Sequence, residues 1–146
     1  MKTDETTYID LTPIELWRLG DRGTSRLNKM RLPPRPPGAK IDIRTFTTKE
    51  GELWVKAGTG GVSIFDGKNP KLRGTHWWRI PANSPIPSEL KITKDSRKDK
   101  ITGLTHYRIE PIFDMPLNMF IDLLTKFAKN AEKSFSETEI PGKEKI

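Results

Sequence analysis

Short apolar segments of period two recur along most of the chain, each bounded by Gly, Pro, Asn or Asp. Segments of four to eight residues that are rich in β-branched and aromatic side chains are typical of β-strands. The pattern predicts strands over residues 14–19, 41–46, 52–57, 62–65, 76–80, 90–93 and 104–109. Because little helical sequence separates them, we expect an antiparallel or mixed twisted sheet rather than a doubly wound parallel one.

The hydrophobic period changes from two to that of a helix near residue 114. Asp114-Met115-Pro116 is expected to open a helix, with the proline in the first turn, where its missing N–H costs nothing. Apolar residues then recur at spacings of three and four, at Leu117, Phe120, Ile121, Leu124, Phe127, Ala128 and Ala131. This stripe is expected to pack on the sheet, although a partner-binding helix would show the same pattern. The predicted fold class is α+β.

Two proline clusters separate the predicted elements. Residues 33–38, Pro-Pro-Arg-Pro-Pro-Gly, cannot lie inside a helix or a central strand, so they are expected to form a connector. Their PxxP spacing is also that of an SH3 ligand, which leaves an interaction module as a further hypothesis. Residues 81–87 are expected to form an ordered, stiff loop. We expect a single domain over residues 1–134 and a flexible tail over 135–146.

Composition narrows the possible chemistry. The 146 residues include no cysteine and two histidines, which excludes a disulfide framework and thiolate catalysis. His76 and His106 are too few for a typical catalytic zinc site unless carboxylates join them, so we expect no metal. The sequence lacks an apolar run of the roughly 18 residues that a membrane span needs, and its first residues lack the order of a secretory signal. The expected location is a cytoplasm.

Basic residues are concentrated in the middle of the chain. Residues 22–100 carry 18 basic and seven acidic side chains. Such a surface attracts phosphates, although a solvated surface would have the same composition. Trp54 and the run Trp77-Trp78-Arg79 could also stack nucleobases. Because adjacent strand residues face opposite sides, one of Trp77 and Trp78 is expected to lie outside the core. The alternative hypothesis is therefore a non-enzymatic nucleic-acid-binding domain with a basic, Trp-rich surface, unless a crossing loop covers the outer tryptophan.

Few residues indicate a chemistry by pattern alone. Gly58-Thr59-Gly60-Gly61 is neither a phosphate-binding Walker A loop nor GxGxxG, but its glycines allow close backbone approach to a ligand near Ser63. An ordinary hairpin turn would have the same sequence. His106 and Tyr107 are adjacent in a predicted strand, so one should face the core and the other a cleft or solvent.

Arg18 lies in an apolar run, on the strand face opposite Trp17. A buried guanidinium needs a partner, because burying a charge without one is expensive. The partner would be a bound anion or a carboxylate such as Glu15 or Asp21.

Several segments together resemble one known family. These are Leu16-Trp17-Arg18, Gly60-Gly61-Val62-Ser63-Ile64-Phe65-Asp66, Ile80-Pro81, Ile86-Pro87-Ser88-Glu89-Leu90-Lys91-Ile92, Lys94-Asp95, Thr105-His106-Tyr107-Arg108-Ile109-Glu110-Pro111 and Met115. Their order and spacing, over most of residues 14–134, resemble the type VI secretion cytotoxins with an ADP-ribosyltransferase-like fold.

The resemblance implies a compact toxin that uses NAD as its substrate, acts in the cytoplasm of a target cell, and is neutralised by a cognate immunity protein that covers the cleft. It implies that Arg18 contacts the NAD phosphates or ribose. It also implies that Gly60, Gly61 and Ser63 support the nicotinamide pocket, and that His106 and Tyr107 lie at the cleft. The sequence leaves the acceptor of ADP-ribose open between a macromolecule, either a protein or an RNA, and a small molecule.

Two features of the resemblance concern carboxylates and a hydroxyl. Many transferases of this fold use a glutamate late in the sheet, for which Glu89 and Glu110 are the candidates here. Glu110 is four positions after His106 and so on the same strand face, although a surface carboxylate would fit the same position. Val62 stands where the family pattern has a threonine, which predicts the loss of one hydroxyl contact.

Overall fold

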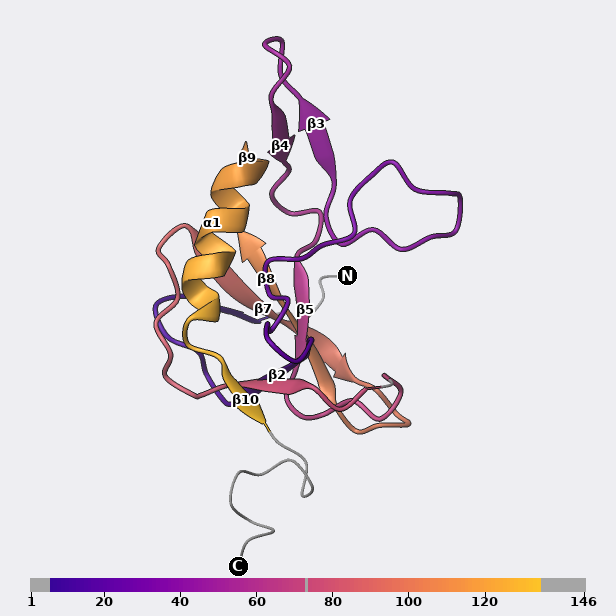
Figure 1. Cartoon of the computed structure of the whole chain (residues 1–146), viewed down its shortest axis with the longest axis vertical. Helices are drawn as coiled ribbons and strands as arrows, with labels where there is room; N and C mark the ends of the chain where they lie inside the picture. Colours follow the sequence, from indigo (N-terminus) through magenta and orange to yellow (C-terminus); the bar gives the residue numbers. More distant parts are fainter. Residues whose placement is uncertain (1–5, 73, 135–146) are drawn as a thin grey trace, which may run out of the picture.

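A seven-stranded antiparallel sheet forms the main body of the molecule (Figure 1). The computed structural model describes residues 6–72 and 74–134. In the order β1-β7-β8-β5-β2-β6-β10, the strands are Thr6–Tyr8 (β1), Leu90–Lys98 (β7), Thr105–Pro111 (β8), Val62–Phe65 (β5), Leu16–Leu19 (β2), Trp77–Ile80 (β6) and Glu132–Ser134 (β10). The expected α+β class with an antiparallel sheet of mostly short strands is confirmed.

A second, three-stranded sheet extends from this body. It consists of β3 (Thr45–Thr47), β4 (Leu53–Val55) and β9 (Met115–Pro116), with β4 in the centre. The helix α1 (Leu117–Ala128) follows β9 directly and packs against β4 and β9 (Figure 1). The helix therefore begins after Pro116, which is its N-cap and pairs with Trp54, so the expectation of a proline inside the first turn is wrong. The extended conformation of Pro116 suits a strand residue and not a helical turn.

The apolar stripe of α1 joins the core of the protein. Phe120, Leu123, Leu124 and Phe127 are buried, and they cluster with the inward-facing residues of the large sheet. Burial of one such side chain contributes about 1.5–3 kcal/mol. The expectation that the helix packs on its own chain is confirmed, and its buried face is not free for a partner.

Long-range pairing accounts for the strands that the sequence pattern misplaced. β7 continues to Lys98, past the predicted end at Thr93, because its charged second half pairs with β8 through an irregularity. The strand predicted over 41–46 is reduced to Thr45–Thr47, and residues 41–44 instead run beside the glycine turn that precedes β5. The pattern did not predict β1 and β10, which are three residues long and polar and lie at the two edges of the large sheet.

The loop over residues 81–87 is ordered, as expected. Thr12 Oγ1 donates to the Pro81 carbonyl at 2.9 Å and accepts from the Ser84 backbone N–H at 2.9 Å. Ser84 Oγ donates to the same carbonyl at 2.7 Å. Residues 33–38 lie in the connection between β2 and β3, and the SH3-ligand hypothesis stays a prediction. The expected flexible tail, residues 135–146, lies outside the described residues.

Candidate active site

The turn from Gly58 to Gly61 leads into β5 and forms one wall of a cleft. Gly60 has φ of 146°, and a Cβ there would lie 2.1 Å from the Asp42 carbonyl oxygen. A Cβ on Gly61 would lie 2.1 Å from the Ile109 carbonyl oxygen of β8. Only glycine permits this approach. The paired glycines therefore pack the turn against two other backbone segments and fix the start of β5.

Three neighbouring strands bring a serine, a histidine and an aspartate into a row. Ser63 of β5 pairs with Arg108 of β8, which places His106 diagonally across from the serine. The Nε2 atom of His106 lies 2.8 Å from Ser63 Oγ, and its Nδ1 atom lies 2.6 Å from Asp95 Oδ2 on β7. The structure thus brings together Ser63 and His106, as the resemblance implies, and adds Asp95.

Arg108 connects this row to a buried glutamate. Its Nη1 donates to Asp95 Oδ1 at 2.7 Å, and its Nε lies 3.1 Å from Glu110 Oε2. Glu110 is only 3% exposed, so its interpretation as a surface carboxylate is wrong. The glycine turn packs against the side chain of Glu110, as shown by the 3.0 Å that would separate a Cβ on Gly61 from the Glu110 Cγ. Glu110 is therefore connected to the row through its ion pair with Arg108.

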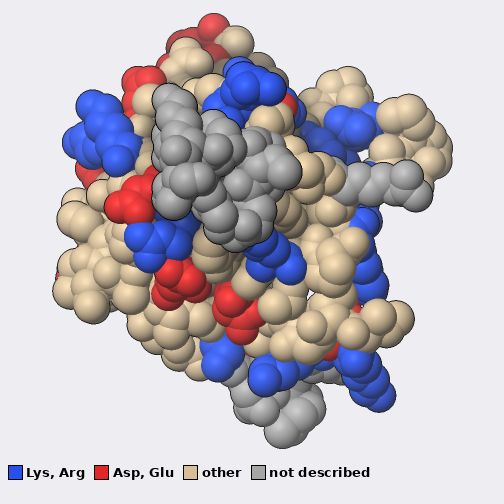
Figure 2. All heavy atoms as spheres, turned by 60° about the horizontal axis from the view of Figure 1, so that its bottom comes forward, with Lys and Arg blue, Asp and Glu red and all other residues tan. Residues whose placement is uncertain are grey.

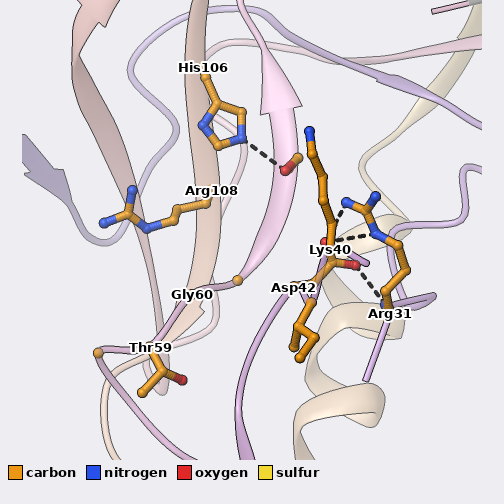
Figure 3. Close-up of a pocket in the computed structure, with 11 residues that line it drawn as sticks. Arg31, Lys40, Asp42, Thr59, Gly60, His106 and Arg108 are labelled. Carbon is orange, nitrogen blue, oxygen red and sulfur yellow. Dashed lines mark hydrogen bonds and ion pairs between the residues drawn. The ribbon is translucent and has the colours of Figure 1, made fainter. Parts of the chain in front are cut away.

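A cleft of about 590 Å³ opens above these residues (Figure 3). It is lined by Arg31, Lys40, Ile41, Asp42, Gly58, Thr59, Gly60, Gly61, Ser63, His106 and Arg108. Lys40 and His106 project from opposite walls. Arg31 is held in place by Asp42, whose Oδ1 accepts from Nη2 at 2.7 Å and from Nε at 3.2 Å. The side-chain hydrogen bond with Asp42 raises the pKa of Arg31, which keeps the guanidinium charged.

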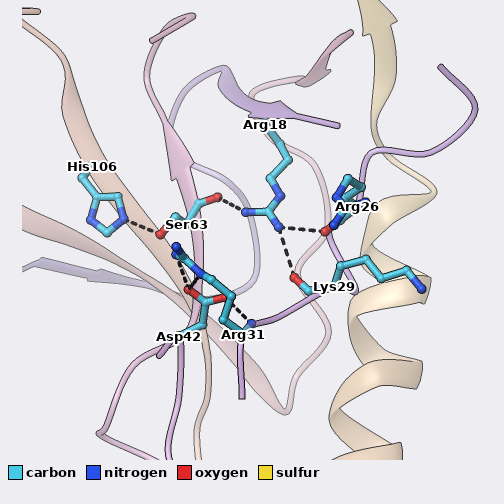
Figure 4. A network of polar contacts seen from close by, with 7 residues as sticks. All are labelled: Arg18, Arg26, Lys29, Arg31, Asp42, Ser63 and His106. Atoms are coloured by element: carbon cyan, nitrogen blue, oxygen red, sulfur yellow. Dashed lines mark hydrogen bonds and ion pairs between the residues drawn. The ribbon is translucent and has the colours of Figure 1, made fainter. Parts of the chain in front are cut away.

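Arg18 supports the site from behind (Figure 4). Its Nη1 donates to the Ser63 carbonyl at 2.8 Å, and its Nη2 donates to the carbonyls of Arg26 at 2.8 Å and Lys29 at 3.2 Å. The Nε atom is buried, with no hydrogen-bond partner within the described ranges. Burial lowers the pKa of Arg18 to about 10.

The carboxylate partners expected for Arg18 are engaged elsewhere. Glu15 pairs with Arg79 at 2.7 Å, and Asp21 pairs with Arg26 at 3.0 Å. The alternative of an ion pair between Arg18 and Glu15 or Asp21 is therefore wrong, and backbone carbonyls accept from the guanidinium instead. Arg18 also lines a second hollow of about 590 Å³. Ser63 and His106 line both this hollow and the cleft.

Three residues singled out from the sequence lie outside the cleft. Tyr107 is 3% exposed and packs in the core, where burial raises the pKa of its phenol to about 12. The alternation of β8 sends His106 to the cleft and Tyr107 to the core, as the strand pattern predicts. Glu89 precedes β7, and its carboxylate lies 3.3 Å from Ser88 Oγ. Val62 is 1% exposed in the core, so a hydroxyl at this position would not reach the cleft.

The tryptophans proposed for stacking make contacts within the protein. Trp77 is buried, and Trp78 on the opposite face donates its indole N–H to the Asp21 carbonyl at 2.9 Å, so the loop after β2 crosses it. Trp54 packs beside Phe46, with ring centroids 6.1 Å apart. On the face in Figure 2, basic side chains are interspersed with acidic ones. These contacts count against nucleobase stacking as the role of the tryptophans.

The site contains residues that the sequence pattern did not identify. Asp95 stands in a charged stretch where the apolar alternation has ended, and Arg31, Lys40 and Asp42 belong to the connection between β2 and β3. Each reaches the site through long-range packing. Asp95 is two residues after Thr93 and four after Lys91, which pair with Arg108 and Glu110. Extending the predicted strand past residue 93 would therefore have placed Asp95 on the face that carries Arg108.

Two other kinds of feature are absent from the described ranges, 6–72 and 74–134. No group of three His, Cys, Asp or Glu side chains there is arranged to hold a metal ion. No helix there has the length and apolar character needed to cross a bilayer.

The fold and the site define a small α+β protein with a serine–histidine pair in a basic cleft, and comparison with known proteins gives its family. Residues 14–135 match the model of the family described as Tse2 ADP-ribosyltransferase toxin. The chain belongs to this family, which confirms the resemblance to type VI effector toxins. It is 34% identical over 98 residues to Toxin Tse2 of Pseudomonas aeruginosa strain PAO1. The match covers 67% of this chain and 61% of the relative, so the chain spans less than two thirds of that protein.

Proposed function

We propose that the protein is an NAD-dependent toxin with an ADP-ribosyltransferase-like fold over residues 1–134, and that it transfers ADP-ribose to a target in the cytoplasm of another cell. The family gives the class of reaction. The observation that carries the proposal is the 2.8 Å contact between Ser63 Oγ and His106 Nε2 in the cleft. A hydroxyl and an imidazole in contact form the minimal pair for moving a proton during group transfer.

The charges of the cleft suit an anionic dinucleotide. Arg31, Lys40 and Arg108 line it and would face the pyrophosphate of NAD, because guanidinium and ammonium groups bind phosphate oxygens strongly. The turn at Gly60 and Gly61 would form the wall beside the nicotinamide. Arg18 lines the adjoining hollow, from which its positive charge would attract the bound dinucleotide. It would also hold the backbone of Ser63 in position beside the dinucleotide.

The proposed transfer breaks one bond and forms one. The bond between nicotinamide and ribose C1 breaks, and nicotinamide leaves with the electron pair. A lone pair of the acceptor then bonds to C1, while the acceptor proton passes through Ser63 to His106 Nε2. Glu110 would hold Arg108 in place through their ion pair, while Tyr107 packs in the core and Glu89 lies outside the cleft.

The proposed partners are an acceptor macromolecule and an immunity protein. The acceptor is a protein or an RNA, and the hollow shared by Arg18, Ser63 and His106 is the proposed place for it. The immunity protein would inhibit the toxin by covering the cleft, and the exposed Lys40 offers it an ion-pair partner at the rim.

A labelling experiment tests this function. The chain and its Ser63→Ala and His106→Ala variants are made by cell-free synthesis and incubated with NAD labelled in the adenosine half and a bacterial lysate. We expect the parent to transfer label to a macromolecule, and each variant to lose at least roughly a hundredfold in rate, as general acid–base groups do. Growth arrest on induced expression should follow the same order.

Ser88→Ala is the matched control, because Ser88 is an exposed serine outside the cleft. It should label the lysate as the parent does. Absence of label from the parent at all NAD concentrations would overturn the proposal. Salt-sensitive binding of RNA or single-stranded DNA without any labelling would favour the nucleic-acid-binding alternative.

A further inference from the structure

Asp95 takes no part in the proposed transfer itself, yet its carboxylate contacts His106, the proposed proton acceptor. We propose that Asp95 is a positioning residue that holds the proton of neutral His106 on Nδ1, so that the Nε2 lone pair faces Ser63. The proposal deepens the proposed function, because it explains how His106 is prepared to accept a proton.

The direction of the hydrogen bonds follows from the chemistry of the groups. A carboxylate only accepts, so the 2.6 Å contact between Asp95 Oδ2 and His106 Nδ1 requires a hydrogen on Nδ1. A neutral imidazole has one hydrogen, which leaves Nε2 as an acceptor. The Ser63 hydroxyl, 2.8 Å away, then donates to it. The contact with the Asp95 carboxylate is thus what favours the neutral tautomer with its hydrogen on Nδ1.

Arg108 fixes the orientation of Asp95. It donates to the second carboxylate oxygen, Oδ1, at 2.7 Å, and it is itself held by the buried Glu110. Asp95 thus presents one oxygen to Arg108 and the other to His106. The side chain of Asp95 is 31% exposed, so this pairing, and not burial, holds its position.

The three groups come from three adjacent strands, which makes their alignment a property of the sheet. β7 carries Asp95, β8 carries His106, and β5 carries Ser63. The arrangement has the same order of roles as a Ser-His-Asp triad, in which the aspartate orients the imidazole and stabilises its protonated form. Here it serves proton transfer during glycosyl transfer, with no acyl group involved.

The position of the histidine proton is directly measurable. The chain holds two histidines, His76 and His106, so proton–nitrogen NMR of protein made with isotope-labelled histidine gives two imidazole patterns. A His76→Gln variant identifies the pattern of His106. At a pH where both rings are neutral, we expect His106 to carry its proton on Nδ1.

Two variants separate the influence of Asp95 from that of Ser63. In Asp95→Asn the amide N–H donates to Nδ1, so the proton of His106 should move to Nε2. In Ser63→Ala it should stay on Nδ1. Asp122→Asn, an exposed carboxylate on α1, is the matched control and should leave the spectrum unchanged.

A parent His106 with its proton on Nε2, or one that remains doubly protonated at high pH, would overturn the proposal. The same would follow if Asp95→Asn were folded and kept the Nδ1 tautomer. If Asp95→Asn does not fold, the parent and Ser63→Ala spectra still decide. Because the readout needs no NAD, a parent without transferase activity would overturn the proposed function alone.

Where the parent does transfer ADP-ribose, Asp95→Asn should lower kcat by roughly 10²- to 10⁴-fold and leave KM for NAD near the parent value. A change confined to KM would contradict a positioning role.

Discussion

The two faces of strands β5 and β8 differ in chemistry while sharing one backbone. One face contributes four buried side chains to the core, from Val62, Ile64, Tyr107 and Ile109. The other carries the polar groups of the cleft, Ser63, His106 and Arg108. Because side chains alternate, a single pair of strands both holds the protein together and builds its site. Stability and activity should therefore respond to different substitutions at neighbouring positions.

The largest contrast is expected between Ile64→Ala and Ser63→Ala. Ile64 is fully buried, and its truncation should lower the free energy of unfolding by about 2–5 kcal/mol. Ser63→Ala should change it by about 1 kcal/mol while removing activity. Denaturant titration and the labelling rate per folded molecule measure the two effects. Equal effects of both changes on both quantities would show that the faces are not separable.

Gly61→Ala should affect both faces at once. The new methyl group would meet the Ile109 carbonyl oxygen at 2.1 Å, so β5 and β8 must move apart. We expect a loss of about 3 kcal/mol in unfolding free energy and of labelling activity. Gly23→Ala is the control, because a Cβ at Gly23 would meet open space and its φ is not positive. A Gly61→Ala protein as stable as the parent would contradict the close approach.

Val62→Thr tests whether position 62 belongs to the core. A hydroxyl there is buried, and it should lower the free energy of unfolding by about 1–3 kcal/mol. The labelling rate per folded molecule should stay at the parent value. A higher rate would place the side chain in the cleft after all.

The smallest effect concerns the titration of Tyr107. Tyr8→Phe leaves it as the single tyrosine and removes the contribution of Tyr8 to the shift. The phenolate absorbance should then appear with a pKa that burial still holds above its ordinary value of 10.0, while tryptophan fluorescence reports a folded chain. The raised pKa means that the neutral phenol favours the folded state. In the parent chain, the contribution of this phenol to the free energy of unfolding is complete below about pH 10 and is lost as pH rises through about 12. A midpoint near 10 in the folded chain would contradict burial.

Local periodicity predicted the fold better than it predicted the site. The apolar stripe of α1 and the alternation around Ser63 and His106 are set by neighbouring residues, and the structure confirms both. The edge strands β1 and β10 depend on partners distant in sequence, and their polar sequences carry no signal.

The site was predictable only where a motif or a resemblance marked it. The paired glycines, Ser63 and His106 were identified in this way. Asp42 was not, and Asp95 was marked only as part of the Lys94-Asp95 segment, with no role in the site. Their partners, Arg31 and His106, are 11 residues distant in the chain and meet them only through folding. A charged stretch by itself does not reveal which of its members will face a cleft.

The anchoring of Arg18 bears on how freely this protein can diversify. Its guanidinium holds the carbonyls of Ser63, Arg26 and Lys29, and every amino acid supplies a carbonyl. Substitutions at position 29 therefore leave the anchor intact, whereas position 26, with φ of 60°, favours residues that adopt the left-handed region. The loop between β2 and β3 can change its outward side chains, and with them the surface that an inhibitor must match, while the backbone behind the site stays in place. A lysine at position 18, with one ammonium group in place of a planar fork, could not span the same three oxygens.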